Sequence, residues 1–262
     1  MTPEQIEQSA AAIWKARTTA VPIAALLNGA MPQNRADGYA VQQALARLSG
    51  QQAYGWKIAA TSSAGQKHIG VDGPLAGRLF IDRVLPMCLP ISLTGNSMRL
   101  GEAEFAFRMA QDLPGREKPY GVDEVMAAVG ALYPAIELPD SRFIECNNAG
   151  APSLIADNAC AHEFVLGDEV KTDWRRLDLA KHRVTVTCNG ESNCEGFGAN
   201  VLGDPRIALT WLANELNTYG LKLRAGETVT TGTCVVPFAL RPGARFTADF
   251  GVLGMVSISF KD

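Results

Sequence analysis

The sequence predicts a mixed α+β protein, with helices first and short strands through most of the remaining chain. Three observations support this fold class. Apolar residues recur at helical spacing in the first part of the sequence. After residue 54 the pattern changes to short apolar runs separated by turn residues. Later helical stretches lie singly between strands, without a regular strand–helix alternation. We therefore expect an N-terminal helical subdomain at residues 1–54 and a β-rich domain at residues 55–262.

Two helices are expected in the N-terminal subdomain. The first begins at Thr2-Pro3-Glu4-Gln5, a capping-box pattern that places proline at the first helical position. Its apolar stripe includes Ile6 and Trp14. The second helix is expected over roughly residues 37–48 and ends near Gly50.

The elements of the β-rich domain follow from apolar runs and the residues that end them. A helix over residues 123–132 stops before Pro134, because proline cannot continue it. Asn189-Gly190 predicts a hairpin turn after an alternating strand at residues 183–188. Asp204-Pro205 begins a further helix, which Gly220 ends. The other strands are expected at residues 55–61, 100–109, 135–138, 228–234, 245–250 and 255–260.

Composition excludes several classes of protein. The chain has 262 residues, 47% of them hydrophobic, and a net charge of −3 without a basic run, which disfavours nucleic-acid binding. No apolar stretch approaches the roughly 20 residues that a membrane helix needs, and the polar N-terminus is unlike a secretion signal. The six cysteines are scattered without a Cys-x-x-Cys pair. We therefore expect reduced thiols, no structural zinc and a cytoplasmic location.

Three glutamates stand out as candidate metal ligands. Glu102 and Glu104 lie two apart in a predicted strand, so their carboxylates point to the same face. Glu137 follows in another strand-like apolar run. Carboxylates held together in apolar surroundings are costly unless a cation joins them, and three oxygen ligands suit Mg²⁺ or Mn²⁺. The alternative is that the first two glutamates form the solvated face of an edge strand.

Several ordered motifs together resemble a known family across nearly the whole chain. The set is similar to the 2-oxopent-4-enoate hydratases and 4-oxalocrotonate decarboxylases of the fumarylacetoacetate hydrolase superfamily. The motifs are Gly55-Trp56-Lys57-Ile58, Gly70-Val71-Asp72, Glu102-Ala103-Glu104-Phe105-Ala106-Phe107, Ala135-Ile136-Glu137-Leu138-Pro139-Asp140-Ser141-Arg142, Ala156-Asp157-Asn158-Ala159, Asn189-Gly190, Gly203-Asp204-Pro205, Trp211-Leu212-Ala213-Asn214, Leu223-Arg224-Ala225-Gly226 and Thr231-Gly232-Thr233.

The resemblance implies a fold, a cofactor and a setting. It implies a rolled mixed β-sheet under an N-terminal helical region, with Mg²⁺ or Mn²⁺ held by Glu102, Glu104 and Glu137. It implies that Lys57 enters the active site, where it binds the substrate carboxylate or helps to move a proton. It also implies a homo-oligomer acting in bacterial meta-cleavage breakdown of aromatic compounds, in association with a sister pathway enzyme.

The resemblance leaves the reaction open between related activities on small 2-oxo acids. The first expectation is hydration of 2-hydroxypenta-2,4-dienoate (2-oxopent-4-enoate) to a 4-hydroxy-2-oxo acid. The first alternative is decarboxylation of a 2-oxo-3-enedioate, because a metal that polarises the 2-oxo group serves both reactions. Acylpyruvate-type C–C hydrolysis and a non-catalytic partner subunit are weaker alternatives.

Five further residues are candidate substrate contacts. Leu75 stands where many hydratases of this type have an acid, which predicts slower hydration or another group for proton transfer. Cys160 replaces the usual serine of the Asp-Asn-Ala-Ser motif and is a weaker hydrogen-bond donor. Asp140 and Arg142 either bind substrate or form a structural ion pair. Asn158 hydrogen-bonds either a loop or the substrate.

Overall fold

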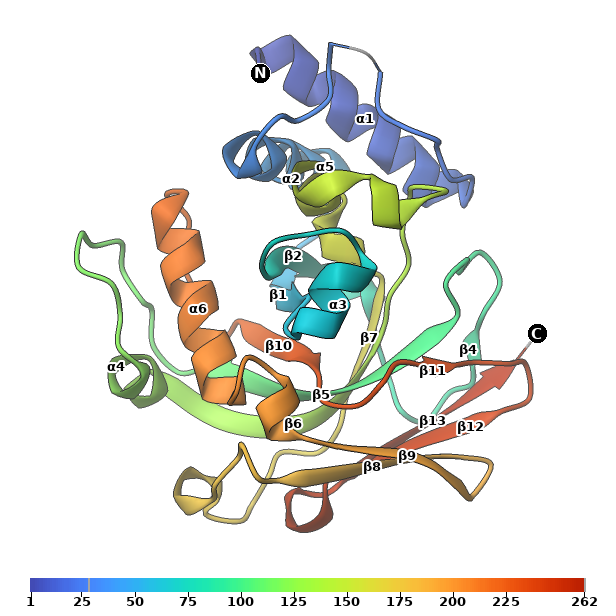
Figure 1. Ribbon diagram of the computed structural model, residues 1–262, viewed down its shortest axis with the longest axis vertical. Coiled ribbons are helices and arrows are strands. Elements are labelled where there is room, and N and C mark those ends of the chain that lie inside the picture. Colours follow the sequence, from blue (N-terminus) through green and yellow to red (C-terminus); the bar gives the residue numbers. More distant parts are fainter. Residues whose placement is uncertain (28, 262) are drawn as a thin grey trace.

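The computed structural model describes residues 1–27 and 29–261 and has the predicted mixed α+β architecture. Two β-sheets form the lower and central parts of the molecule in Figure 1, and α1, α2 and α5 lie above them. The helices are α1 (Pro3–Thr19), α2 (Arg35–Ser49), α3 (Ser63–His68), α4 (Val122–Ala127), α5 (Gly150–Ala156) and α6 (Pro205–Thr218).

Among the described residues, the larger sheet has eight strands in the order β2-β1-β10-β5-β6-β7-β3, with β11 beside β5. The sheet is mixed, because β1 pairs with β10 in parallel whereas β5 is antiparallel to β10 and β6. Its strands are β1 (Ala53–Ala59), β2 (Leu75–Phe80), β3 (Val84–Leu85), β5 (Leu100–Met109), β6 (Val129–Leu138), β7 (Glu163–Leu166), β10 (Thr228–Thr233) and β11 (Phe238–Ala239).

The smaller sheet packs beneath the larger one and shares its apolar core. Phe105 of β5 meets Phe250, which follows β12, edge-on at a ring-centroid distance of 5.1 Å. Over the described chain this sheet has the order β4-β13-β12-β8-β9. Its strands are β4 (Ile91–Ser92), β8 (Arg183–Cys188), β9 (Glu191–Phe197), β12 (Arg245–Asp249) and β13 (Met255–Lys261).

The N-terminal helices share a small apolar cluster with a later part of the chain. Ile13 of α1 and Leu45 of α2 pack in this cluster, and Phe143 and Ala156 complete it. The helical layer therefore depends on residues on both sides of the predicted boundary at residue 54, and that boundary stays a prediction. No helix among the described residues has both the length and the apolar character to cross a membrane.

Most predicted elements are present close to their expected bounds. The capping box at Thr2 begins α1, and Gly50 ends α2 in a left-handed conformation. Asn189 and Gly190 both have positive φ and join β8 to β9, as the hairpin signal predicts. Local signals sufficed here because each of these ends depends on neighbouring residues.

The expected helix over residues 123–132 is wrong in its second half. Helix α4 ends at Ala127, and β6 begins at Val129. Val129 and Leu132 are buried, and strand β6 pairs along β5, so tertiary pairing overrides the helical pattern.

Helix α3 was not expected from the sequence. The Ser62 side chain caps this helix by accepting a hydrogen bond from the Gly65 N–H at 3.0 Å.

Candidate functional site

Three glutamates and one lysine meet on one face of the larger sheet, and we call them the acid cluster (Glu102, Glu104, Glu137 and Lys57). Glu102 lies directly opposite Glu137 in the β5–β6 pairing, and Glu104 is two residues further along the same face. One carboxylate oxygen from each glutamate lies within 4.8 Å of the others. Glu104 and Glu137 have no exposed surface and Glu102 is partly buried, so the solvated edge considered for Glu102 and Glu104 is excluded for Glu104.

The neighbouring strand β10 holds the Glu104 carboxylate in place. The Thr230 hydroxyl donates a hydrogen bond to Glu104 Oε2. The Gly232 N–H donates to the same oxygen at 2.7 Å. A register shift between Thr230 and Thr233 turns these groups towards the carboxylate. Among the described residues, Glu104 Oε1 is buried and has no hydrogen-bond partner.

Gly232 cannot be replaced by a larger residue without moving its surroundings. Its φ is +102°, a conformation that favours glycine, and a Cβ there would lie 2.3 Å from Thr61 Oγ1. The absence of a side chain therefore allows the backbone N–H to reach Glu104.

Lys57 enters the acid cluster from strand β1. Its Nζ lies 3.2 Å from Glu137 Oε2, and its side chain is 3% exposed. Burial alone lowers the pKa of Lys57, but Glu137, followed by Glu102 and Glu104, raises that pKa above its ordinary value. The ammonium group is therefore held charged, as a donor facing three carboxylates.

Ionisation of the buried carboxylates is unfavourable when no cation is bound. Burial, and then the charge of Glu102, raise the pKa of Glu104 to about 8. Burial also raises the pKa of Glu137 to about 7, although Lys57 opposes this shift. Three ionised carboxylates and one ammonium group leave two net negative charges. Oxygen donors with this charge excess fit a divalent cation.

A left-handed turn borders the acid cluster. Asn158, Ala159 and Cys160 have φ values of 54°, 49° and 62°. The turn packs against β2 at Gly77, where a Cβ would lie 1.8 Å from the Asn158 carbonyl oxygen. Asn158 Oδ1 accepts a hydrogen bond from the Arg78 N–H at 3.3 Å. This partner lies in strand β2, so the side chain of Asn158 has a structural contact, and the loop and substrate contacts considered from the sequence both stay predictions.

Cys160 is unsuited to act as a nucleophile. Burial, and then the charge of Asp157, raise the pKa of the Cys160 thiol to about 12. A thiol that stays protonated is a weak nucleophile and a weak hydrogen-bond donor. The expected position in the pocket lining stays a prediction.

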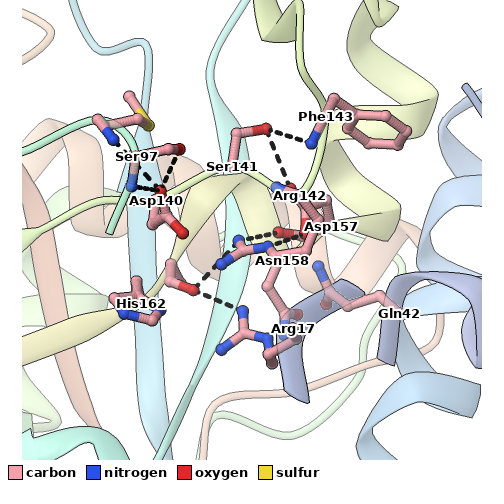
Figure 2. A network of polar contacts seen from close by, with 12 residues as sticks. Arg17, Gln42, Ser97, Asp140, Ser141, Arg142, Phe143, Asp157, Asn158 and His162 are labelled. Atoms are coloured by element: carbon pink, nitrogen blue, oxygen red, sulfur yellow. Dashed lines mark hydrogen bonds and ion pairs between the residues drawn. The ribbon is translucent and has the colours of Figure 1, made fainter. Parts of the chain in front are cut away.

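Asp140 and Arg142 do not pair with each other. Asp140 instead accepts two hydrogen bonds from Ser97 (Figure 2). The Ser97 N–H donates to Asp140 Oδ1 at 2.8 Å, and the Ser97 hydroxyl donates to the same oxygen at 2.6 Å. Arg142 Nε lies 2.5 Å from Asp157 Oδ1, and both side chains are buried. The structure thus gives each residue a structural partner, and their contacts with substrate stay predictions.

Leu75 begins strand β2 and is fully buried in the main apolar core. Its backbone pairs with Ala59, two residues after Lys57. Burial of Leu75 in the core does not test whether its side chain also contacts the substrate, so that contact stays a prediction.

Sequence reasoning missed several groups around the acid cluster. Thr230 had no signal of its own, whereas Gly232 lay in the Thr-Gly-Thr motif without a distinguishable role. The His162 N–H donates to Glu137 Oε1 at 3.4 Å, a backbone contact that side-chain chemistry does not reveal. Asp157 lay in the Asp-Asn-Ala motif, but its partner Arg142 could not be read from spacing.

Known proteins resemble the chain over its full length. No family model matches it. A 2-keto-4-pentenoate hydratase of Paraburkholderia xenovorans is 33% identical over 264 residues, which cover 100% of this chain and 97% of the relative. A 2-hydroxyhexa-2,4-dienoate hydratase of Comamonas testosteroni is 30% identical, with 98% of each chain covered.

Solved structures have the same fold. The 4-oxalocrotonate decarboxylase of Pseudomonas putida G7, complexed with magnesium and adipate, matches with a TM-score of 0.89 and 29% identity over 99% of this chain and 98% of that one. The same enzyme complexed with calcium and acetate has a TM-score of 0.88. A fumarylpyruvate hydrolase of Pseudomonas aeruginosa, at 15% identity, a TM-score of 0.60 and coverage of 79% and 88%, shows the fold alone.

The fold, the acid cluster and these likenesses define a lyase with a fumarylacetoacetate hydrolase-like fold and a site suited to a divalent metal. The predicted rolled mixed sheet and lyase class are confirmed. The chain belongs to the 2-keto-4-pentenoate hydratase family.

Proposed function

We propose that the chain adds water to 2-hydroxypenta-2,4-dienoate or a closely related dienol, giving a 4-hydroxy-2-oxo acid. Glu102, Glu104 and Glu137 hold Mg²⁺ or Mn²⁺, and the enzyme acts in meta-cleavage catabolism of aromatic compounds. Two curated relatives at 33% and 30% identity carry hydratase names.

The observation that carries this proposal is the charge excess of the buried acid cluster. A divalent cation would neutralise the two net negative charges and would be bound by Glu104 Oε1, which has no hydrogen-bond partner among the described residues. When bound, the metal supplies Lewis acidity towards the 2-oxo acid group. The 4-oxalocrotonate decarboxylase structures, solved once with magnesium and once with calcium, support a cation of this kind.

The chain's own groups fix the geometry and provide a proton donor. Thr230 and Gly232 hold Glu104 Oε2, which leaves the other oxygen of this carboxylate for the metal. Lys57 is charged and buried, so it can bind the substrate carboxylate or donate a proton across a short distance.

Decarboxylation of a 2-oxo-3-enedioate is the second candidate. The likeness to 4-oxalocrotonate decarboxylase supports it, as does an apolar Leu75 where an acid would handle water. Hydration remains the first choice because the curated relatives with at least 30% identity that match the whole chain include several hydratases.

The deciding assay follows two reactions in metal-depleted protein and again after Mg²⁺ or Mn²⁺ is added. One measures hydration of 2-hydroxypenta-2,4-dienoate, and the other measures CO₂ from a 2-oxo-3-enedioate. Metal-dependent hydration supports the proposal. Prompt CO₂ release with negligible hydration replaces it with the decarboxylase, and inertness towards both substrates refutes both.

A variant pair tests the role of residue 75. Leu75→Asp restores the missing acid and should raise hydration if this side chain reaches the substrate. Leu79→Asp on the same strand is the matched control, because Leu79 is also buried and the substitution carries the same desolvation cost. Equal losses in both variants would show that Leu75 only fills the core.

We also propose that the chain forms a homo-oligomer in the cytoplasm, in association with a sister pathway enzyme. Exposed apolar side chains, including Ile144, Val236 and Val252, are available for burial at a subunit interface. Light scattering after size-exclusion chromatography measures the subunit number, and a monomeric mass would reject the oligomer.

A further inference from the structure

A second polar site lies beside the C-terminal end of α1. A cavity of about 210 Å³ is lined by Arg17, Arg83 and Arg142, together with Asp140 and other residues. We call it the arginine cavity. No residue of the acid cluster lines it. Segment 140–142, which follows β6, forms one wall, and α1 forms another.

Two buried guanidinium groups converge at this cavity. Arg17 Nη2 donates to the Ala161 carbonyl at 2.6 Å, and Arg142 Nη2 donates to the same oxygen at 3.5 Å (Figure 2). The two residues are 8% and 3% exposed. Within residues 1–27 and 29–261, Arg17 Nε and Arg142 Nη1 are buried without a hydrogen-bond partner. Like charges at this separation repel unless an anion lies nearby.

Only one of these charges lacks a counter-ion in the described chain. Arg142 pairs with Asp157 at 2.5 Å, and Arg83 lies 3.8 Å from Glu163. No described carboxylate lies within ion-pair distance of Arg17. Burial, and then the charge of Arg142, lower the pKa of Arg17 to about 9. A buried charge without a close partner is strongly unfavourable, so an anion held beside Arg17 would stabilise the folded chain.

We propose that the arginine cavity binds one small, singly charged carboxylate between Arg17 and Arg142, separately from the acid cluster. Guanidinium groups match the two oxygens of a carboxylate. Asp140 and Glu163 also line the cavity, and they repel a doubly charged anion such as phosphate about twice as strongly as a singly charged one. The cavity has room for a compact ligand only.

The arginine cavity has a direct link to the acid cluster. His162 lines the cavity, and its backbone N–H donates to Glu137 Oε1. Its ring Nδ1 is buried and lacks a partner among the described residues. His162 therefore contacts both sites. It borders the arginine cavity, and its backbone N–H holds the candidate metal ligand Glu137.

Calorimetric titration with acetate tests this second site. The Mg²⁺-loaded protein and its Glu102→Gln variant are both titrated, because acetate can also bind to a metal, and Glu102→Gln weakens the metal site. We expect one acetate site to persist in Glu102→Gln. Arg17→Met should weaken that site about tenfold or more, the value of a lost charge-assisted hydrogen bond. Lys15→Met, which removes an exposed charge from the same helix, should leave it unchanged.

Several results would overturn the proposal. Acetate binding that disappears in Glu102→Gln and is unaffected by Arg17→Met would place the anion on the metal. Absence of binding in both backgrounds would mean that the cavity holds water alone. Tighter binding of inorganic phosphate than of acetate would reject the singly charged ligand. Because these titrations need no turnover, failure of the proposed hydratase activity does not affect them.

A second variant guards against misfolding of Arg17→Met. Arg17→Lys keeps the charge but loses the planar pair of donors, so it should bind acetate more weakly than the unsubstituted protein while melting at a similar temperature. Equal acetate affinity in Arg17→Lys, Arg17→Met and the parent protein would also reject the site.

Discussion

The acid cluster and the arginine cavity are buried charge sites of opposite sign, joined by the segment that runs from Glu137 to Arg142. The acid cluster is built from paired strands, and neighbouring backbone and hydroxyl groups fix its glutamates. The arginine cavity is built from long side chains that reach a shared carbonyl from a helix and a loop. The comparison indicates that sheet register sets the positions of the glutamates, whereas the second site depends on long side chains that meet from separate elements.

The largest expected effect comes from Glu104→Gln, which keeps the size of the side chain and removes its charge. Turnover should fall about a thousandfold or more, since a catalytic metal supplies several kcal/mol. Metal affinity should fall as well. Metal titration measures the loss of affinity, and steady-state kinetics measures the loss of turnover. Glu7→Gln, at an exposed glutamate on α1, is the control and should retain both properties. Normal turnover of Glu104→Gln in excess chelator would remove the metal from the reaction.

Lys57→Met tests the positive charge within the acid cluster. Turnover should fall by about 10²–10⁴-fold, the usual contribution of a positioned proton donor. The circular dichroism spectrum should be unchanged, because methionine fills similar space. A folded variant with normal kcat and KM would show that Lys57 only balances charge.

Arg142→Met and Arg17→Met should differ in stability, and this difference sharpens the comparison within the arginine cavity. Arg142→Met leaves the buried Asp157 unpaired, which should cost about 3–5 kcal/mol of unfolding free energy. Arg17→Met leaves no carboxylate unpaired, so its unfolding free energy should stay equal or rise when no anion is added. Urea unfolding of both variants measures the contrast, and equal losses would mean that Arg17 has a counter-ion.

The smallest effect is a pH dependence of the metal-free protein. A carboxyl group with a higher pKa in the folded state binds an extra proton there, so stability falls as pH rises. For Glu104 the decrease should run from about its unfolded value of 4.5 to about pH 8, where the folded group ionises. Thermal melts across this range should show a decreasing Tm, and Glu104→Gln should flatten the curve. A Tm that rises over this range would contradict the burial argument.

The sequence predicted the acid cluster better than its surroundings for a physical reason. Glu102 and Glu104 follow strand alternation, which is local, and Glu137 lies on the next strand of an antiparallel pair. The role of Lys57 came from family resemblance. Arg17 gave no signal, because its partner carbonyl at Ala161 is 144 residues away and only the folded chain brings them together.

Secondary structure shows the same division between local and distant causes. Helix caps at Thr2 and Gly50 were predictable from neighbouring residues. Residues 129–132 were not, since pairing with β5 decides their conformation. Arg142 was expected to contact Asp140 or substrate, but the backbone brings Asp157 beside it instead.

The position of β10 has a consequence for protein synthesis. This strand comes from residues 228–233 yet lies between β1 and β5 in the sheet. A ribosome releases β1, β5 and β6 well before β10, so a nascent chain carries all three glutamates before Thr230 and Gly232 exist to hold Glu104. Glu104 therefore gains its two hydrogen bonds from β10 only after that strand is made, later than the strands that carry the glutamates.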